Sequence, residues 1–348
     1  MFTLSHDNLK SYYGKVLQKS SDLKTNACCC DPDAISAEIK AVLKQIHPEV
    51  TDRFYGCGSP IPPLLEGKTV LDLGCGTGRD AYVLSKLVGE SGRVLGVDMT
   101  DEQLAVARKH IGYHMEAFGY AKANIEFRQG FIEDLGEIGI ADDSVDIVVS
   151  NCVINLSPDK EAVFREIFRV LKPGGELYFS DVFADRRIPK PLQDDPVLHG
   201  ECLGGALYIE DFRRLLRRVG CPDYRTISKA PITIDNDELQ AKIGMVSFSS
   251  VTVRAFKLDV LEDICEDFGQ VATYTGGIPN HPHYFDLDDH HRLFKGKPML
   301  VCGNTAAMLG QTRFAPHFAV TGDQSVHFGP FDCTPATSEA PAVSAGCC

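Results

Sequence analysis

Short apolar runs alternate with amphipathic segments through the middle of this 348-residue chain. Because apolar residues recur at helical spacing between the runs, the pattern predicts an alternation of strands and helices. Such an alternation indicates a doubly wound, mostly parallel α/β sheet of Rossmann-like type. We expect the last strand to pair antiparallel at one side of the sheet. The predicted strands are 68–73, 93–97, 124–128, 145–150, 175–182, 224–229 and 246–257, and the predicted helices are 80–88, 101–118, 160–170 and 210–219.

The segment before the first strand, residues 1–62, is too short for a domain and too apolar for a disordered tail. It predicts a helix at 9–18 and a second at 32–46, with Asp31 as the N-cap of the second. A Pro-rich link follows. We therefore expect an N-terminal helical lid that lies across the site.

The chain after the alternation divides into two further parts. We assign residues 63–258 to the sheet domain, and residues 259–332, which lose the alternation, to a small C-terminal α+β domain. Residues 333–348 are rich in Ala, Pro, Ser and Thr and predict a disordered tail that ends in Cys347-Cys348.

A glycine-rich turn joins the first predicted strand to its helix. The stretch from Val70 to Asp80 reads VLDLGCGTGRD, and the next strand ends at Asp98, 20 residues after Gly78. Glycines accept positive φ and let a ligand approach the backbone, and the helix start offers unpaired N–H groups. A carboxylate at that distance commonly binds ribose hydroxyls. The combination favours a nucleoside cofactor site over a plain turn.

Asp72 helps to decide between a dinucleotide and S-adenosylmethionine as the cofactor. A dinucleotide places its pyrophosphate on the helix N-terminus, where the Asp72 carboxylate would repel it. S-adenosylmethionine carries an ammonium group, ribose and adenine but no phosphate, so the pattern favours S-adenosylmethionine over NAD. The candidate cofactor residues are Asp72, Gly74, Gly76, Gly78, Asp98, Met99, Ile132, Glu133, Asn151 and Cys152.

Charge and hydropathy exclude several classes of partner. The net charge is −13 and no basic run is present, which argues against nucleic acid. The first ten residues lack the apolar core of a secretory signal, and no run approaches the ~20 apolar residues of a membrane span. We expect a soluble, cytoplasmic monomer with no membrane partner.

Thirteen cysteines are an unusual number for such a protein. In a reducing compartment they favour metal or metalloid ligation, or redox chemistry, over a disulfide framework. No C-x-x-C is present, so a zinc ribbon or thioredoxin-type site has little support and we expect no metal cofactor. We expect packing or helix-end roles for Cys75, Cys221, Cys265 and Cys302.

Other cysteines leave the choice between packing and ligation open. Cys57, Cys152 and Cys202 stand beside Gly, Asn or Glu at expected site positions. Cys28, Cys29 and Cys30 are adjacent and cannot all share one buried face.

The region 281–291 gathers His and Asp residues. Without periodic ligand spacing we expect a hydrogen-bonded structural loop there, with a metal site as the alternative.

No acid–base pair or His dyad stands out at the strand ends. Oxygen and nitrogen acceptors usually need a general base. Its absence favours a nucleophile that needs none, and thiolates are the natural ligands of soft, thiophilic centres.

Several motifs carry a family resemblance. VLDLGCGTG, together with Asp98, Ile132-Glu133 and LKPGG at 171–175, resembles the class I methyltransferases over residues 68–258. More specific stretches resemble the arsenite S-adenosylmethionine methyltransferases over the whole chain except its tail. They are YYG at 12–14, SSDLKTNACC at 20–29, RFYGCG at 53–58, SNCVINL at 150–156, GECLGGAL at 200–207 and HPHYFDLDDHHRLFKGKPMLVCGNTAAML at 281–309.

This resemblance implies four functional cysteines: Cys29 (with Cys28 and Cys30 as neighbouring alternatives), Cys57, Cys152 and Cys202. Cys57, Cys152 and Cys202 would hold trivalent arsenic, supplied as arsenite or methylarsenite. Cys29 and Cys57 would form a disulfide relay that thioredoxin or glutathione re-reduces. The ring of Tyr55 would face the sulfonium of the cofactor.

Two other hypotheses remain at this point. One keeps the fold but changes the acceptor, giving a small-molecule C- or O-methyltransferase with incidental cysteines. The other is a non-enzymatic thiol protein that sequesters arsenic or other soft metals.

Overall fold

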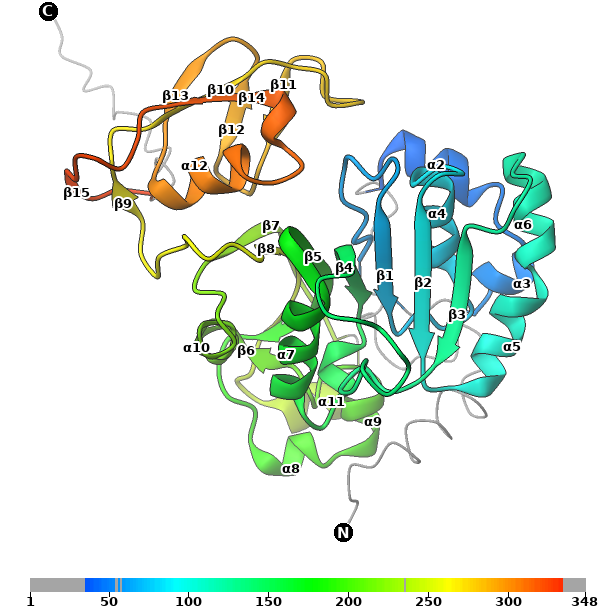
Figure 1. Cartoon of the computed structure of the whole chain (residues 1–348). Coiled ribbons are helices and arrows are strands. Elements are labelled where there is room, and N and C mark those ends of the chain that lie inside the picture. The colour runs from blue at the N-terminus through cyan, green and yellow to red at the C-terminus, as the bar shows by residue number, and fades with distance from the viewer. Residues whose placement is uncertain (1–34, 54–55, 57, 235, 334–348) are drawn as a thin grey trace, which may run out of the picture.

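The structure, a computed structural model, describes residues 35–53, 56, 58–234 and 236–333. Its centre is a sheet with the strand order β3-β2-β1-β4-β5-β8-β7, in which β6 also pairs with β5 (Figure 1). The strands are β1 (Thr69–Leu73), β2 (Arg93–Asp98), β3 (Ile125–Gln129), β4 (Val145–Asn151), β5 (Leu171–Ala184), β6 (Leu207–Tyr208), β7 (Tyr224–Pro231) and β8 (Phe248–Phe256).

The first five strands pair in parallel, as the alternation of strands and helices predicts. β8 is antiparallel to both β5 and β7. The antiparallel pairing of the last strand is therefore confirmed. Its place is different from the prediction, since β8 lies inside the sheet and β7 forms the edge.

Helices cover both faces of the sheet (Figure 1). Their bounds are α4 (Arg79–Leu87), α5 (Asp101–Lys109), α6 (Ile111–Phe118), α7 (Lys160–Val170), α8 (Lys190–Gln193), α9 (Pro196–Gly200), α10 (Ile209–Arg218) and α11 (Asp237–Ile243), with a short 3₁₀ helix η4 (Ile154–Leu156). The prediction of one helix at 101–118 is wrong. It breaks at His110, which has φ −102° and ψ 9° and whose Nε2 lies 2.8 Å from the Glu49 carboxylate.

The N-terminal segment contributes α2 (Ala37–Leu43) and α3 (Pro48–Thr51), which lie against α4 and α5. The prediction of a helix from 32 to 46 is wrong in its bounds, because Ser36 is the N-cap and accepts from the Ile39 N–H. The Thr77 hydroxyl donates to the Val50 carbonyl at 2.8 Å. This part of the N-terminal segment is thus bonded to the glycine turn. The predicted helix at 9–18, Asp31, Tyr55, the cysteines Cys28, Cys29, Cys30 and Cys57, and tail residues 334–348 lie outside the described residues.

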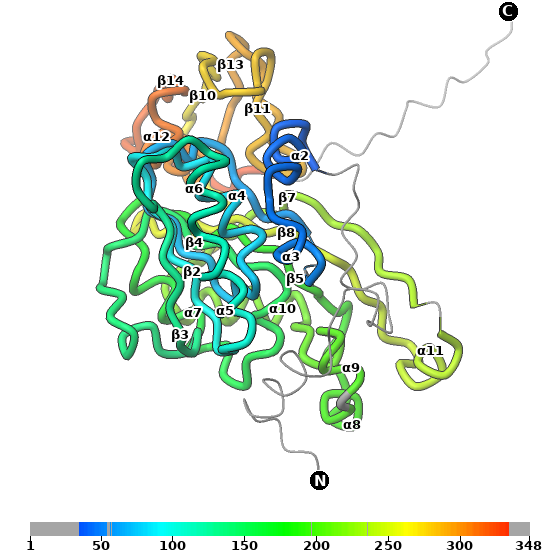
Figure 2. The backbone as a smooth tube through the Cα atoms, turned by 90° about the vertical axis from the view of Figure 1, so that its right-hand side faces the viewer, coloured from blue at the N-terminus to red at the C-terminus, as the bar shows by residue number. Residues whose placement is uncertain are grey.

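The C-terminal part forms a small α+β unit with its own core. Its elements are β9 (Glu266–Asp267), β10 (Val271–Tyr274), β11 (Tyr284–Asp286), β12 (Arg292–Phe294), β13 (Pro298–Leu300), α12 (Gly303–Gly310), η5 (Ala315–His317), β14 (Phe318–Thr321) and β15 (Gly329–Pro330). It lies beyond the amino ends of β1 and β2, whereas α8, α9 and α11 lie on the carboxyl side (Figures 1 and 2).

A buried group of three charges connects this unit to the sheet. The Glu176 carboxylate of β5 pairs with Arg254 of β8 and with Arg313, and all three side chains are buried. Arg254 also donates to the Leu287 carbonyl at 2.6 Å, and Arg313 donates to the Pro63 carbonyl. The C-terminal unit is therefore bonded to both the sheet and the entry into β1.

Within the described residues, no helix combines the length and the apolar character that crossing a membrane requires.

Candidate functional site

A pocket lies at the carboxyl ends of β1, β2 and β4, where ligands bind in open α/β sheets. Its empty space is about 1010 Å³, counting the part that is open to solvent. The lining residues are Arg53, Gly56, Asp72, Gly74, Cys75, Gly76, Thr77, Arg79, Asp80, Asp98, Met99, Thr100, Gln103, Gly130, Phe131, Ile132, Glu133, Asn151, Cys152, Val153, Leu156 and Ser157.

The glycine turn shapes one wall of the pocket. Gly74 has a φ of +71°, and a Cβ there would lie 2.4 Å from the Val153 side chain, so only glycine fits. Gly76 faces open space and lines the pocket. Gly78, a predicted cofactor residue, is not among the lining residues. It precedes α4 with a φ of +90°, and a Cβ there would meet Phe127.

Three carboxylates meet beside this turn. Asp72 is buried, and its Oδ2 atom has no hydrogen-bond partner within the described part of the chain. Burial, followed by the charges of Asp80 and Asp98, raises the pKa of Asp72 well above its usual range. An orphaned buried carboxylate among other acids is suited to a cationic ligand. The ammonium group of S-adenosylmethionine fits this place and a pyrophosphate does not.

Asp98 holds the turn in position. Its Oδ2 accepts from the Gly76 N–H at 2.9 Å and its Oδ1 accepts from the Thr100 N–H at 2.8 Å. Burial raises the pKa of Asp98, and these backbone hydrogen bonds oppose that shift. Each carboxylate oxygen keeps a second lone pair, so Asp98 can still accept from ribose hydroxyls.

Most of the predicted cofactor residues line this one pocket: Asp72, Gly74, Gly76, Asp98, Met99, Ile132, Glu133, Asn151 and Cys152. Asn151 connects α4 to the segment before β1, because its Nδ2 donates to Asp80 at 2.8 Å and to the Gly58 carbonyl at 2.9 Å. Sequence reasoning missed Asp80, although it stands at the end of the glycine motif. It also missed Arg53, although this residue begins the RFYGCG motif, and it missed Thr100 and Gln103, for which the sequence offers no signal.

Two of the predicted arsenic ligands lie side by side. The Cys202 thiol donates to the Cys152 carbonyl oxygen at 3.2 Å, although 50 residues separate the two along the chain. Both residues are buried, and both have a left-handed backbone, with φ of +56° at Cys152 and +61° at Cys202. Non-glycine residues rarely adopt this conformation, and strained backbone gathers at functional sites. Cys152 is disulfide-bonded in this structure.

Titratable groups surround this pair of cysteines. Burial lowers the pKa of Lys160 to about 8, against the attraction of Asp181 and of Cys202. Burial, followed by the charge of Lys160, lowers the pKa of His199 to about 4. Burial raises the pKa of Asp181 to about 7. Burial is the largest cause of all three pKa shifts, so the surroundings of Cys152 and Cys202 are shielded from water.

The predicted packing or helix-end role is confirmed for Cys75, Cys221 and Cys302. It is wrong for Cys265, which is partly exposed and directly precedes β9, because its sulfur lies against other thiols and not in a core. Cys75 is buried in the pocket wall, and burial raises the pKa of its thiol. Cys221 is buried and donates to the Asp223 carbonyl. Cys302 is the N-cap of α12, which is the predicted helix-end role.

The His/Asp region forms hydrogen bonds of its own. Asp288 accepts from the backbone N–H groups of His290 and His291 and pairs with Arg225 of β7. These contacts fit the structural loop that the sequence predicts.

Comparisons with known proteins point to one family. A methyltransferase domain family matches residues 64–220, and the arsenite methyltransferase C-terminal domain matches residues 269–345. The chain is 58% identical over 327 residues to an arsenite methyltransferase of Aquipseudomonas alcaligenes, covering 94% of each chain. It is 46% identical to the arsenite methyltransferase of Homo sapiens, covering 90% of this chain and 83% of that protein.

A solved structure agrees with these relatives. An arsenic(III) S-adenosylmethionine methyltransferase from Chlamydomonas reinhardtii matches with a TM-score of 0.83 and 53% identity. The match covers 86% of this chain and 100% of that chain.

Proposed function

This chain belongs to the arsenite methyltransferase family, and on that premise we propose that it transfers methyl groups from S-adenosylmethionine to trivalent arsenic held by cysteine thiolates. One observation carries the proposal most directly. Cys152 lines the cofactor pocket and also contacts the Cys202 thiol. The donor pocket and a pair of soft ligands therefore share a wall.

The donor half of the site is built from the glycine turn and its acids. S-adenosylmethionine supplies an electrophilic methyl group when bound. Asp72 would pair with its ammonium group, and Asp98 would accept from its ribose hydroxyls. Asn151 fixes the pocket wall between them through its bonds to Asp80 and Gly58.

The acceptor half would consist of Cys57, Cys152 and Cys202. Three thiolates neutralise As(III) and leave its lone pair free to attack the methyl carbon, so no general base is needed. Orientation of donor and acceptor in well-aligned reactions contributes about 7–11 kcal/mol. Because the sulfonium charge is lost in the step, the buried surroundings of Cys152 and Cys202 favour the reaction.

A disulfide relay would complete the cycle. Methylation raises arsenic formally to As(V), and its return to As(III) needs two electrons. Cys29 and Cys57 would supply them by forming a disulfide, which thioredoxin or glutathione would then reduce. Because Cys152 is disulfide-bonded in this structure, that bond would have to be reduced before Cys152 could bind arsenic. The physiological result would be detoxification of arsenic.

Serine variants test the proposal. We expect Cys152→Ser and Cys202→Ser to lose arsenite-dependent methyl transfer while S-adenosylmethionine still binds. Cys221→Ser changes a buried cysteine of the same fold that lies outside the pocket, and it should retain activity. Full activity in both site variants would refute the arsenic site.

The same preparation separates the alternatives. Stoichiometric arsenite binding without turnover, with cofactor and reductant present, would favour a sequestering protein. Methyl transfer to an organic acceptor but not to arsenic would favour a C- or O-methyltransferase. Product speciation over time with thioredoxin or with glutathione would identify the reductant and the degree of methylation.

A further inference from the structure

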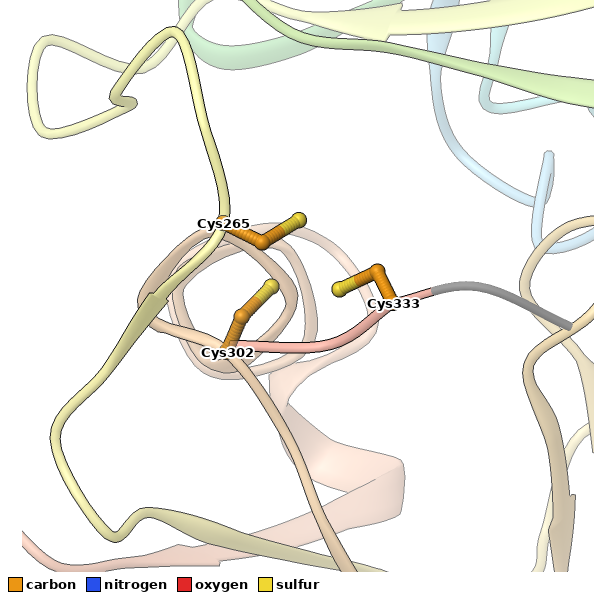
Figure 3. A group of neighbouring side chains, drawn as sticks. All are labelled: Cys265, Cys302 and Cys333. Carbon is orange, nitrogen blue, oxygen red and sulfur yellow. The ribbon is translucent and has the colours of Figure 1, made fainter. Parts of the chain in front are cut away.

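Three cysteines of the C-terminal part come together away from the pocket. The Sγ atoms of Cys265, Cys302 and Cys333 all lie within 4.8 Å of one another. Figure 3 shows the three side chains directed into one common space. All three are free thiols. They belong to the C-terminal unit, which lies beyond the amino ends of β1 and β2 (Figures 1 and 2), whereas the cofactor pocket lies at the carboxyl ends of these strands.

The fold fixes each of these cysteines through its backbone. Cys265 directly precedes β9 and Cys333 follows β15, and these strands pair antiparallel. The Phe331 N–H donates to the Cys265 carbonyl at 2.8 Å, which extends the ladder toward both cysteines. Cys302 is held at the N-terminus of α12, where its Sγ accepts from the Thr305 N–H at 3.4 Å. The cluster is therefore preformed.

The surroundings favour thiolate chemistry. Cys302 is fully buried, whereas Cys265 and Cys333 are partly exposed and leave the group accessible. The Cys302 sulfur accepts from the Thr305 N–H and from the Arg225 guanidinium, and both donors favour its thiolate form. The Arg225 guanidinium lies 3.9 Å from this sulfur.

We propose that Cys265, Cys302 and Cys333 form a second binding site for trivalent inorganic arsenic, separate from the methyl-transfer site. The ligand class rests on the proposed function, since arsenic is what this enzyme would encounter. Arsenous acid would lose its three hydroxyl groups as water, taking the three thiol protons, and three As–S bonds would form. No electron is transferred in this exchange.

Two features favour As(III) over zinc. Structural zinc sites are almost always closed by four protein ligands, whereas the group in the described residues contains three, the number that As(III) needs for a neutral tris-thiolate. Trivalent arsenic is also soft and thiophilic, as are these ligands.

Two other groups in the described part of the chain bring ligand atoms equally close, but cations already occupy them. Glu49 of the His47–Glu49–His110 group pairs with Lys109 at 2.7 Å. Asp288 of the Asp288–His290–His291 group pairs with Arg225. In the cysteine group Arg225 lies 3.9 Å from the Cys302 sulfur, while the thiols of Cys265 and Cys333 bond to each other and to Cys302.

The test uses the full chain with two of the three proposed methyl-transfer ligands, Cys152 and Cys202, replaced by serine. We expect the Cys152→Ser/Cys202→Ser protein, reduced and incubated with arsenite, to retain about one tightly bound arsenic per chain, coordinated by three sulfurs in X-ray absorption. Arsenite should also raise its melting temperature. Adding Cys265→Ser or Cys333→Ser should weaken the affinity roughly 10- to 100-fold or more. Adding Cys221→Ser should not.

The choice of variants keeps the test decisive. Cys265 and Cys333 are partly exposed, so their serine variants should fold, whereas Cys302 caps α12. Unchanged arsenic binding after both substitutions would overturn the proposal, because other thiols would then hold the metalloid. Zn²⁺ binding at the cluster that excess arsenite does not displace would also overturn it.

Failure here is distinguishable from failure of the proposed function. Arsenite methylation by the unmodified chain tests the latter alone. An active enzyme whose Cys152→Ser/Cys202→Ser variant binds no arsenic would refute only the second site.

Discussion

The carboxylate of Asp98 offers the sharpest test of the donor pocket. Asp98→Asn keeps the size of the side chain but leaves one acceptor oxygen where two backbone N–H groups, of Gly76 and Thr100, now bond. The amide NH₂ group would then face one of these N–H groups, and the side chain would lose the charged oxygen that is proposed to accept from the ribose hydroxyls. A hydrogen bond to a charged group contributes about 1.5–3 kcal/mol. Since ~1.4 kcal/mol is tenfold in affinity, the Kd for S-adenosylmethionine should rise about 10- to 100-fold.

Isothermal titration calorimetry measures this effect, with Asp146→Asn as the matched control. Asp146 also accepts from a backbone N–H, that of Thr69 at 2.8 Å, but it lies near the amino end of β1 and outside the pocket. Asp146→Asn should therefore lower stability without weakening cofactor binding. A Kd for Asp98→Asn within about twofold of the unmodified protein, or equal weakening in the control, would refute the reasoning.

Three further predictions concern the pocket and the fold. Gly74→Ala should weaken S-adenosylmethionine binding in calorimetry, because the new methyl group would displace Val153, whereas Gly119→Ala, also at positive φ but in open space, should not. Glu176→Gln should lower the unfolding free energy by about 3–5 kcal/mol in urea titration, since it leaves two buried arginines unpaired. Asp181 contributes stability below pH 4 that is lost as pH rises through its folded pKa of about 7. Asp181→Asn resembles the protonated acid, so that decline should disappear from stability measured between pH 4 and 8.

Each of these has a result that contradicts it. Equal cofactor affinity in both glycine variants would show that Val153 yields freely. A loss of stability in Glu176→Gln no larger than that in Glu210→Gln, an exposed pair with Arg213, would mean that the buried charges are solvated. An unchanged pH slope in Asp181→Asn would assign the titration to another group.

Hydrophobic periodicity predicted most of the sheet, because buried strands leave a local signal. It placed β4 at 145–150, and the structure has it at Val145–Asn151. It failed at β5, predicted at 175–182 and observed at Leu171–Ala184. Pro173, Gly174 and Gly175 predict a helix stop before the strand, but an irregular register with β4 and the Gly174 N–H bond to the Lys257 carbonyl extend the strand through them. Only contacts with residues distant in the chain show that the strand continues through such residues.

The same limit applies to the functional residues. The family motifs identified Cys152 and Cys202, but nothing local indicates that both adopt a left-handed backbone. Cys302 was correctly predicted as a helix-end residue. Cys302 lies close to Cys265 and Cys333 because β9 pairs with β15. Each of these strands has only two residues, which is too short to recognise in a sequence.

The buried Glu176 group constrains how this architecture can be divided. A gene fragment that stopped after β8 would lack Arg313 and the Leu287 carbonyl, leaving a buried carboxylate and a buried guanidinium only partly satisfied. Recombination that removed the C-terminal part would therefore leave these buried charges only partly paired. A shortened descendant would have to replace Glu176 and Arg254 with apolar residues, and such paired replacements would mark lineages in which the last part of the chain has been lost.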